Sequence, residues 1–104
     1  MAAARRQVLD EDLREMTRYF HALKDIMRLR ILIVLATSGE MTVTELARTL
    51  HVSQPLISFH LRPLRTLSLV QVRRVGREVY CSVNLIEIER RQHEFVELLA
   101  EATI

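Results

Sequence analysis

The chain has 104 residues, which is enough for one domain, and a hydrophobic content of 49% is sufficient for a buried core. No stretch approaches the roughly 18 consecutive apolar residues of a membrane span. The charged N-terminus also lacks an apolar signal region, so we expect a cytoplasmic protein with no membrane partner. A single cysteine, Cys81, excludes an internal disulfide or a thiolate cluster, as is typical of a reducing compartment.

Charge is distributed unevenly, although the formal net charge is only +2. Residues 51–80 contain five arginines and one glutamate, whereas residues 81–104 contain two arginines and five glutamates. A basic surface beside an acidic C-terminal segment is typical of a protein that binds a polyanion. The alternative is that these arginines form only a solvated face.

The N-terminal part of the chain is predicted to form two helices. Apolar residues recur at alternating steps of four and three, as in an amphipathic helix, at Leu9, Leu13, Met16, Phe20 and Leu23. A second helix is predicted from about residue 25 to residue 37. Because it is apolar almost all round at residues 31–36, we expect it to lie at the centre of the core.

Residues 42–67 are predicted to form two helices joined by a tight turn. Thr42 begins the first helix, and Glu45 lies three residues later in the capping-box position. Ser53 caps the second helix, with Pro55 in its first turn, where a missing N–H costs little. The pair therefore has the pattern of a helix-turn-helix.

The second of these helices has a buried stripe and an unusual proline. Ile57, Leu61 and Leu64 are spaced by four and three residues, which predicts that they face the core. Pro63 lies in the helix interior, where it removes an N–H and crowds the carbonyl of Phe59 at a cost of about 3 kcal/mol. We therefore expect either a kink at Pro63 or a second half that is offset as a separate turn.

The C-terminal part is predicted to be a hairpin followed by a helix. Apolar and polar residues alternate over residues 70–83 on either side of Gly76 and Arg77, which indicates two strands and a glycine-containing turn. A last helix is marked by Leu85, Ile88, Phe95 and Leu99. The predicted class is mainly α with a small β-hairpin, in the order α-α-α-α-β-β-α of a winged helix-turn-helix.

The chain resembles the ArsR/SmtB (arsenic-repressor) family of small bacterial transcription regulators. The resemblance covers about residues 16–84 and is carried by LKDIMRLRIL at 23–32, ELA at 45–47, VSQPLISFHL at 52–61, LV at 69–70 and GREVY at 76–80. It implies a sequence-specific DNA-binding repressor that acts as a homodimer on a palindromic operator in double-stranded DNA.

The resemblance also implies a division of labour within a single domain spanning residues 1–104. Residues 42–67 would be the helix-turn-helix and residues 70–83 the wing. The first and last helices, within residues 1–22 and 84–104, would pack across the two-fold axis of the dimer.

The recognition helix, the second helix of the motif, offers candidate DNA contacts. Gln54 and Ser58 can both donate and accept hydrogen bonds, which suits the edges of bases. Phe59 is expected to cover apolar surface or to contact a thymine methyl group. Arg62 and Arg65 lie further along and are expected to meet phosphates, although Arg65 could be a structural surface residue.

The flanking segments offer further candidates. Thr42 and Thr44, at a helix start, could bind phosphate through hydroxyl and free N–H groups. Ser53 is expected to act as a helix cap or as a DNA contact. Phosphate or minor-groove contacts are expected from the hairpin residues Arg73, Arg74 and Arg77.

The effector sites of the family are not matched. A metal-binding Cys-Val-Cys run is replaced by Thr42-Val43-Thr44, and hydroxyls are poor ligands for soft metals. The second family site would fall near residues 84–86, where only Asn84 is polar. We therefore expect no cofactor and no metal site of the usual kind.

Other functions remain open. Glu89, His93 and Glu97 recur at steps of four and could hold a divalent ion, although such spacing is more often a solvated face. Cys81 could have a redox role, although a small core residue is the simpler interpretation. A metal- or redox-responsive repressor and a protein-interaction module are therefore alternatives. No nucleophile–base arrangement or glycine-rich phosphate loop is present, so we do not expect an enzyme.

Overall fold

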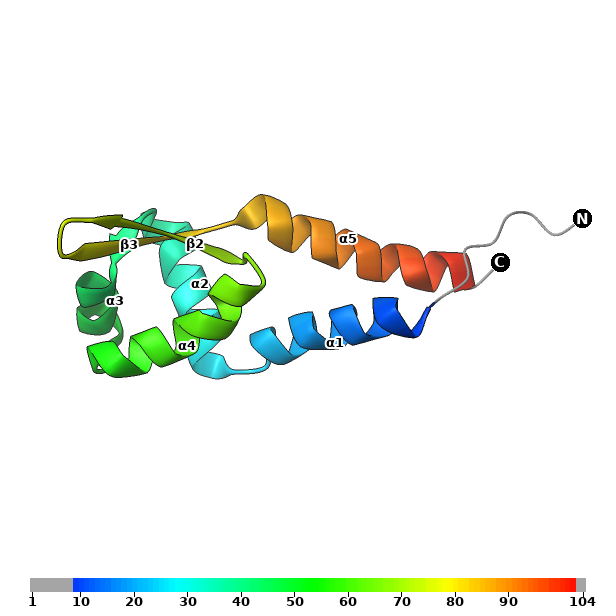
Figure 1. Cartoon of the computed structure of the whole chain (residues 1–104), viewed down its shortest axis with the longest axis horizontal. Coiled ribbons are helices and arrows are strands. Elements are labelled where there is room, and N and C mark those ends of the chain that lie inside the picture. Colours follow the sequence, from blue (N-terminus) through cyan, green and yellow to red (C-terminus); the bar gives the residue numbers. More distant parts are fainter. Residues whose placement is uncertain (1–8, 103–104) are drawn as a thin grey trace, which may run out of the picture.

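The computed structural model describes residues 9–102, which form five helices and a three-stranded antiparallel sheet (Figure 1). The elements are α1 Asp10–Leu23, α2 Ile26–Ser38, β1 Met41–Thr42, α3 Val43–Leu50, α4 Gln54–Thr66, β2 Val70–Val75, β3 Glu78–Val83 and α5 Leu85–Ala102. The predicted order is confirmed, with β1 as an additional short strand. Residues 1–8 and 103–104, the outer parts of the expected dimerisation segments, lie outside the described residues.

Side-chain caps determine where the helices of the motif begin. Oγ1 of Thr42 accepts a hydrogen bond from the N–H of Glu45 at 3.0 Å, and Oε1 of Glu45 accepts one from the N–H of Thr42 at 3.0 Å. This capping box holds the pKa of Glu45 below its usual value, because the charged form accepts the hydrogen bond. Oγ of Ser53 accepts from the N–H of Leu56 at 3.3 Å. Both predicted caps are confirmed.

The turn between α3 and α4 is short because the chain reverses at a single left-handed residue. His51 has φ of +57°, and the N–H of Val52 reaches back to the carbonyl of Ala47 at 3.0 Å. This left-handed residue ends α3, a position that is usually occupied by glycine. The reversal allows Ser53 to cap α4 after only two intervening residues.

The sheet has the strand order β1-β3-β2 and places its apolar residues against the helices. Cys81 lies in the central strand, opposite Met41 of β1 and Val72 of β2. Cys81 is fully buried, which confirms its interpretation as a small core residue. β1 escaped prediction because a strand of two residues is too short to show alternation.

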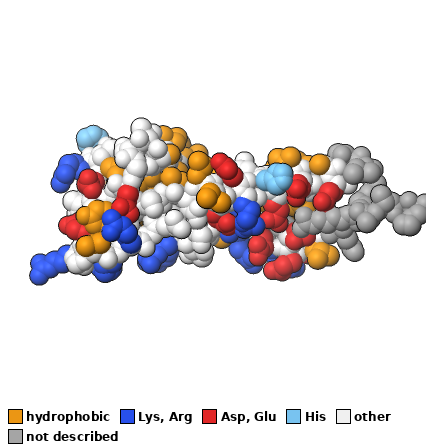
Figure 2. All heavy atoms as spheres, turned by 90° about the horizontal axis from the view of Figure 1, so that it is seen from above, with side chains coloured by type: hydrophobic (Ala, Val, Ile, Leu, Met, Phe, Trp, Pro, Cys, Tyr) orange, Lys and Arg blue, Asp and Glu red, His pale blue; other side chains and the backbone are white. Residues whose placement is uncertain are grey.

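The core lies where one face of α2 meets α3, α4 and the sheet. Ile31 and Leu35 of α2 are buried there, with Leu46 of α3 among their partners. Helix α2 is therefore part of the core, as expected, but only one of its sides is covered, because Ile33 in its apolar stretch is 65% exposed. Figure 2 shows hydrophobic side chains gathered along one edge of this part of the molecule.

Helices α1 and α5 form a two-helix arm that extends away from the sheet and the helix-turn-helix (Figure 1). The Phe20 and Phe95 rings meet edge-on with centroids 5.0 Å apart, which joins the two helices. The guanidinium of Arg91 lies 5.9 Å from the Tyr19 ring. No described helix is both long and apolar enough to cross a membrane.

Helix α4 runs unbroken from Gln54 to Thr66, with Pro63 inside it. The alternative of a second half offset as a separate turn is therefore wrong. Beyond Pro63 the helix ends through Ser68, which has φ of +60°, and the N–H of Leu69 returns to the carbonyl of Leu64 at 2.8 Å.

Candidate nucleic-acid interface

Helix α4 divides cleanly into a buried side and an exposed side. Ile57, Leu61 and Leu64 are buried as predicted, and His60 joins them at 9% exposure. The five predicted contact residues of this helix are all exposed: Gln54, Ser58, Phe59, Arg62 and Arg65. Phe59 is 59% exposed, so it covers little apolar surface within the described residues and is available to a partner.

A groove of about 270 Å³ separates α4 from the wing and gathers several of the predicted residues. Its polar lining consists of Ser58, Arg62 and Arg65 from α4 and Arg74 from β2, over an apolar floor that includes Leu61 and Val72. We call it the wing groove. Three of its lining residues are therefore arginines, and none is aspartate or glutamate. Such a groove attracts a polyanion.

Strand alternation separates the two neighbouring wing arginines. Arg74 lies on the same face of β2 as Val72 and lines the wing groove. Arg73 lies on the opposite face, above Tyr80 in β3, with its guanidinium 4.5 Å from the ring centroid. The two arginines were expected to act alike, whereas the structure assigns them to different surfaces.

Arg73 is also engaged by an acidic partner that no sequence pattern indicates. Its Nη2 and Nε donate to the two carboxylate oxygens of Glu40 at 2.7 and 2.8 Å. The bond from Arg73 holds the pKa of Glu40 below its usual value, so this carboxylate stays charged. Glu40 follows α2 and lies 33 residues away in the chain, so no local pattern could reveal the pair.

The two threonines at the start of α3, Thr42 as its cap and Thr44 in its first turn, are only partly accessible. Thr42 is only 6% exposed, and its hydroxyl is engaged in the capping box. Accepting that bond does not use the hydroxyl hydrogen, so it is the burial of Thr42, and not the cap, that limits its contact with a phosphate. Thr44 is half-buried, whereas Ser53 is exposed and is also a cap. Arg77 is exposed at the hairpin turn, beside Gly76 with φ of +60°.

His60 fixes α4 against the start of α2. Its Nδ1 accepts a hydrogen bond from Nε of Arg28 at 3.4 Å and lies 3.7 Å from Oδ1 of Asp25. The same Asp25 oxygen caps α2 by accepting from the N–H of Met27 at 2.8 Å. The spacing of His60 from Ile57 and Leu64 could have revealed its burial, but only the tertiary structure shows its partners.

The candidate sensing residues are not assembled into a site. Cys81 is fully buried, and burial raises the pKa of its thiol to about 11. His93 and Glu97 pair at 2.9 Å, with side chains 72% and 51% exposed. Among the described residues, no group of three His, Cys, Asp or Glu side chains is placed to hold a metal ion, and that includes the trio Glu89, His93 and Glu97.

Comparison with known proteins identifies similar chains. The family model "Bacterial regulatory protein, arsR family" matches residues 25–72. A transcriptional repressor SmtB homolog from Synechocystis is 45% identical over 69 residues, which are 66% of this chain and 52% of the relative. The present chain thus spans about half the length of that relative. The arsenic resistance regulator ArsR2 of Pseudomonas putida is 37% identical over 80% of this chain and 71% of its own.

A solved structure shows a similar architecture. A homodimeric winged helix-turn-helix DNA-binding domain from Mycobacterium bovis, described as a possible ArsR-family regulator, has a TM-score of 0.69 and 26% identity. The match covers 97% of this chain and 91% of that domain. The observed fold is therefore the winged helix-turn-helix predicted from the sequence.

Proposed function

Because this chain belongs to the arsR family of bacterial regulatory proteins, we propose that it is a repressor that binds a specific DNA operator as a homodimer. The observation that carries the proposal is the wing groove, which three arginines from α4 and β2 line beside the exposed side of α4. The named relatives are transcriptional regulators, and we accordingly propose no catalytic activity. Bacterial DNA lies in the cytoplasm, where we place the protein.

Gln54 and Ser58 are proposed to contact base edges. They lie in the N-terminal half of α4, the part of a recognition helix that enters the major groove. Both are exposed and carry groups that can donate or accept hydrogen bonds. Phe59 is exposed beside them, so its ring could contact a thymine methyl group. Ser53, at the helix start, is proposed to meet the adjoining backbone while it caps α4.

The arginines are proposed to contact phosphates. Arg62, Arg65 and Arg74 line the wing groove, so one DNA strand passing between α4 and the wing would meet all three. Arg77, exposed at the wing tip, is proposed to contact a phosphate or the minor groove of the DNA. Arg73 is left out of this set because Glu40 already neutralises it. Thr42 and Thr44 are also left out as hydroxyl donors, because Thr42 is buried and Thr44 is half-buried.

The homodimer is proposed to form through the arm. Apolar side chains remain exposed on both of its helices, including Leu13 at 47% on α1 and Val96 at 57% and Leu99 at 53% on α5. The similar domain from Mycobacterium bovis is homodimeric. A two-fold axis through the arm would present two copies of α4 to half-sites about 34 Å apart, so the operator would be palindromic.

The proposal is tested by selecting bound sequences from a random pool of DNA duplexes with the purified protein. We expect enrichment of a palindrome. Gln54→Ala should relax the preference at one base pair in each half-site by about 1–3 kcal/mol. Gln92→Ala, at an exposed position of α5, is the matched control and should leave the preference unchanged. Absence of any enriched sequence, or equal effects of the two variants, would overturn the proposal.

A further inference from the structure

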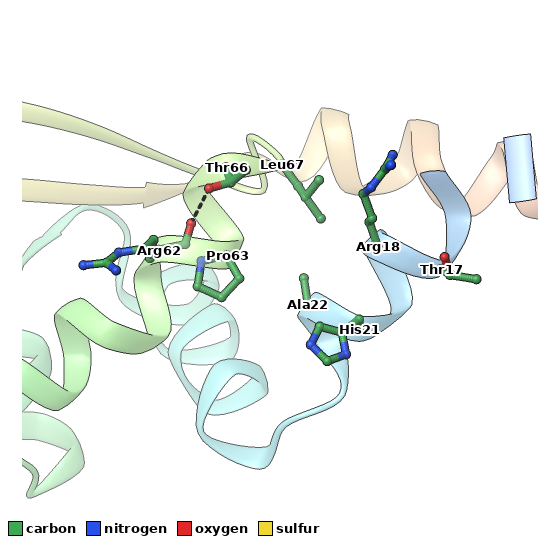
Figure 3. A pocket seen from close by; sticks show the side chains of 8 residues that line it. All are labelled: Thr17, Arg18, His21, Ala22, Arg62, Pro63, Thr66 and Leu67. Atoms are coloured by element: carbon green, nitrogen blue, oxygen red, sulfur yellow. Dashed lines mark hydrogen bonds between the residues drawn. The ribbon is translucent and has the colours of Figure 1, made fainter. Parts of the chain in front are cut away.

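A second and larger groove lies on the other side of α4 (Figure 3). It separates the C-terminal half of α1 from the second half of α4 and has a volume of about 690 Å³. This volume is within the range of about 300–1,000 Å³ that accommodates small organic ligands. We call it the α1–α4 groove. None of its lining residues belongs to the wing, and the residues of its interior are not among the proposed DNA contacts.

The walls of the α1–α4 groove are apolar. Ala22 from α1 and Pro63 and Leu67 from the end of α4 line it, and Figure 3 shows Pro63 and Leu67 directed toward the hollow. Pro63 brings ring methylene groups and no N–H to this wall. The residue that weakens α4 as a helix therefore contributes an apolar surface to the groove.

All the ionisable residues that line the groove are basic. Arg18 and His21 from α1 and Arg62 from α4 line it, and no aspartate or glutamate does. Figure 3 shows the guanidinium groups of Arg18 and Arg62 directed away from the hollow, so each side chain must turn to bring its charge to a molecule bound there. An apolar interior with a cationic edge complements an apolar molecule that ends in an anionic group.

Arg62 connects this groove to the proposed DNA surface. It lines both the α1–α4 groove and the wing groove, so the same guanidinium can serve only one of them at a time. No described acidic side chain forms an ion pair with Arg62. Its guanidinium can therefore bind either a DNA phosphate or another anion.

We propose that the α1–α4 groove is an effector site for an organic acid with an apolar body, whose carboxylate draws Arg62 away from DNA. The apolar body would pack on Pro63, Leu67 and Ala22, and Arg18 would provide the second cation. Binding of the acid is independent of the proposed DNA-binding function, whereas its regulatory consequence rests on that function. Removal of one phosphate contact per subunit would weaken operator binding and lower its dependence on salt.

Ligand binding is tested first, by isothermal titration of the full chain with decanoate, decanol and acetate. Decanoate should bind at one site per subunit, decanol at least about tenfold more weakly because it lacks the charge, and acetate at least about a hundredfold more weakly because it lacks the apolar body. Arg18→Gln should weaken decanoate binding about tenfold. The matched control is Arg14→Gln, one turn earlier on α1 and outside the groove lining, which should have no effect.

Several results would overturn the effector site. These are an absence of decanoate binding, equal binding of decanol, or equal effects of Arg14→Gln and Arg18→Gln. A second variant, His21→Trp, fills the groove from an exposed position and should abolish binding, whereas His93→Trp on α5 should not. Circular dichroism melting confirms that each variant is folded.

The regulatory consequence is tested separately, with fluorescence anisotropy of operator DNA. Decanoate should weaken operator binding by the wild-type chain but not by His21→Trp. If decanoate binds and operator affinity is unchanged, the coupling through Arg62 is wrong. If no operator is found at all, the proposed repressor function fails while the titration result stands.

Discussion

Replacement of Arg74 and of Arg73 by glutamine should have very different effects on DNA binding, although the two residues are neighbours in the chain. Arg74 lines the wing groove beside Arg62 and Arg65. Arg73 points to the opposite face of the sheet and is paired with Glu40 at 2.7 Å. Only the Arg74 variant removes a cation that can release counterions from a DNA phosphate.

The magnitude follows from how many DNA phosphates the variant no longer neutralises. Each neutralised phosphate contributes about 0.9 to the slope of log affinity against log salt concentration, so removing one in both subunits of a dimer lowers the slope by about 1.8. Between about 50 mM and about 200 mM salt, this difference in slope corresponds to a factor of about twelve in relative affinity. Arg73→Gln should change the slope by less than about 0.5, because its charge is already neutralised.

The assay is fluorescence anisotropy of a labelled operator duplex at several salt concentrations, with wild type, Arg74→Gln and Arg73→Gln measured in parallel. Glu40→Gln provides an independent check, since release of Arg73 from its carboxylate partner should steepen the slope if the freed guanidinium can reach DNA. Equal flattening by Arg73→Gln and Arg74→Gln would refute the reasoning from strand alternation. An unchanged slope in Arg74→Gln would remove the wing groove from the DNA path.

Other predictions concern stability and reactivity. Pro63→Ala should raise the free energy of unfolding in urea by about 1–3 kcal/mol, because it restores an interior helix N–H, and it should alter operator affinity; no change in either would show that the proline is accommodated without strain. Hydrogen bonds and charge from Arg90 and Arg91 lower the pKa of Glu87 to about 2. Glu87 should therefore stabilise the fold by about 1–2 kcal/mol above pH 4.5 and lose this effect as pH falls toward 2. Melting curves of Glu87→Gln against wild type check this, and a difference that persists at pH 2 would contradict it. Burial and a pKa of about 11 should make Cys81 unreactive toward iodoacetamide at pH 8 until urea unfolds the chain; rapid alkylation of the folded protein would reopen a redox role.

The local elements follow from the sequence because their causes are local. The capping box at Thr42 and the cap at Ser53 involve residues three positions apart, and the stripe at Ile57, Leu61 and Leu64 repeats with the period of a helix. The hairpin turn is likewise marked by alternation over adjacent residues. Short-range geometry of this kind is sufficient to predict the winged helix-turn-helix order.

The place of α2 in the core was predicted, but not which of its sides is covered. A run of apolar residues shows that a helix prefers to be covered, but it does not show how many sides its neighbours cover. Ile31 and Leu35 face α3, α4 and the sheet, whereas Ile26 and Ile33 remain exposed. The number of packing partners is a property of the assembled fold, so composition alone does not show which apolar side chains of a core helix remain exposed.

The sequence by itself determined the order of the elements, the helix-turn-helix and the residue types on the exposed side of α4, because these depend on spacing within a few turns. Only the tertiary structure decided which arginines act together. Arg74 joins Arg62 and Arg65 across the wing groove, while Arg73 turns to Glu40, a residue 33 positions away. The physical reason is that one step along a strand reverses the face of the sheet, and what each face meets depends on distant parts of the chain.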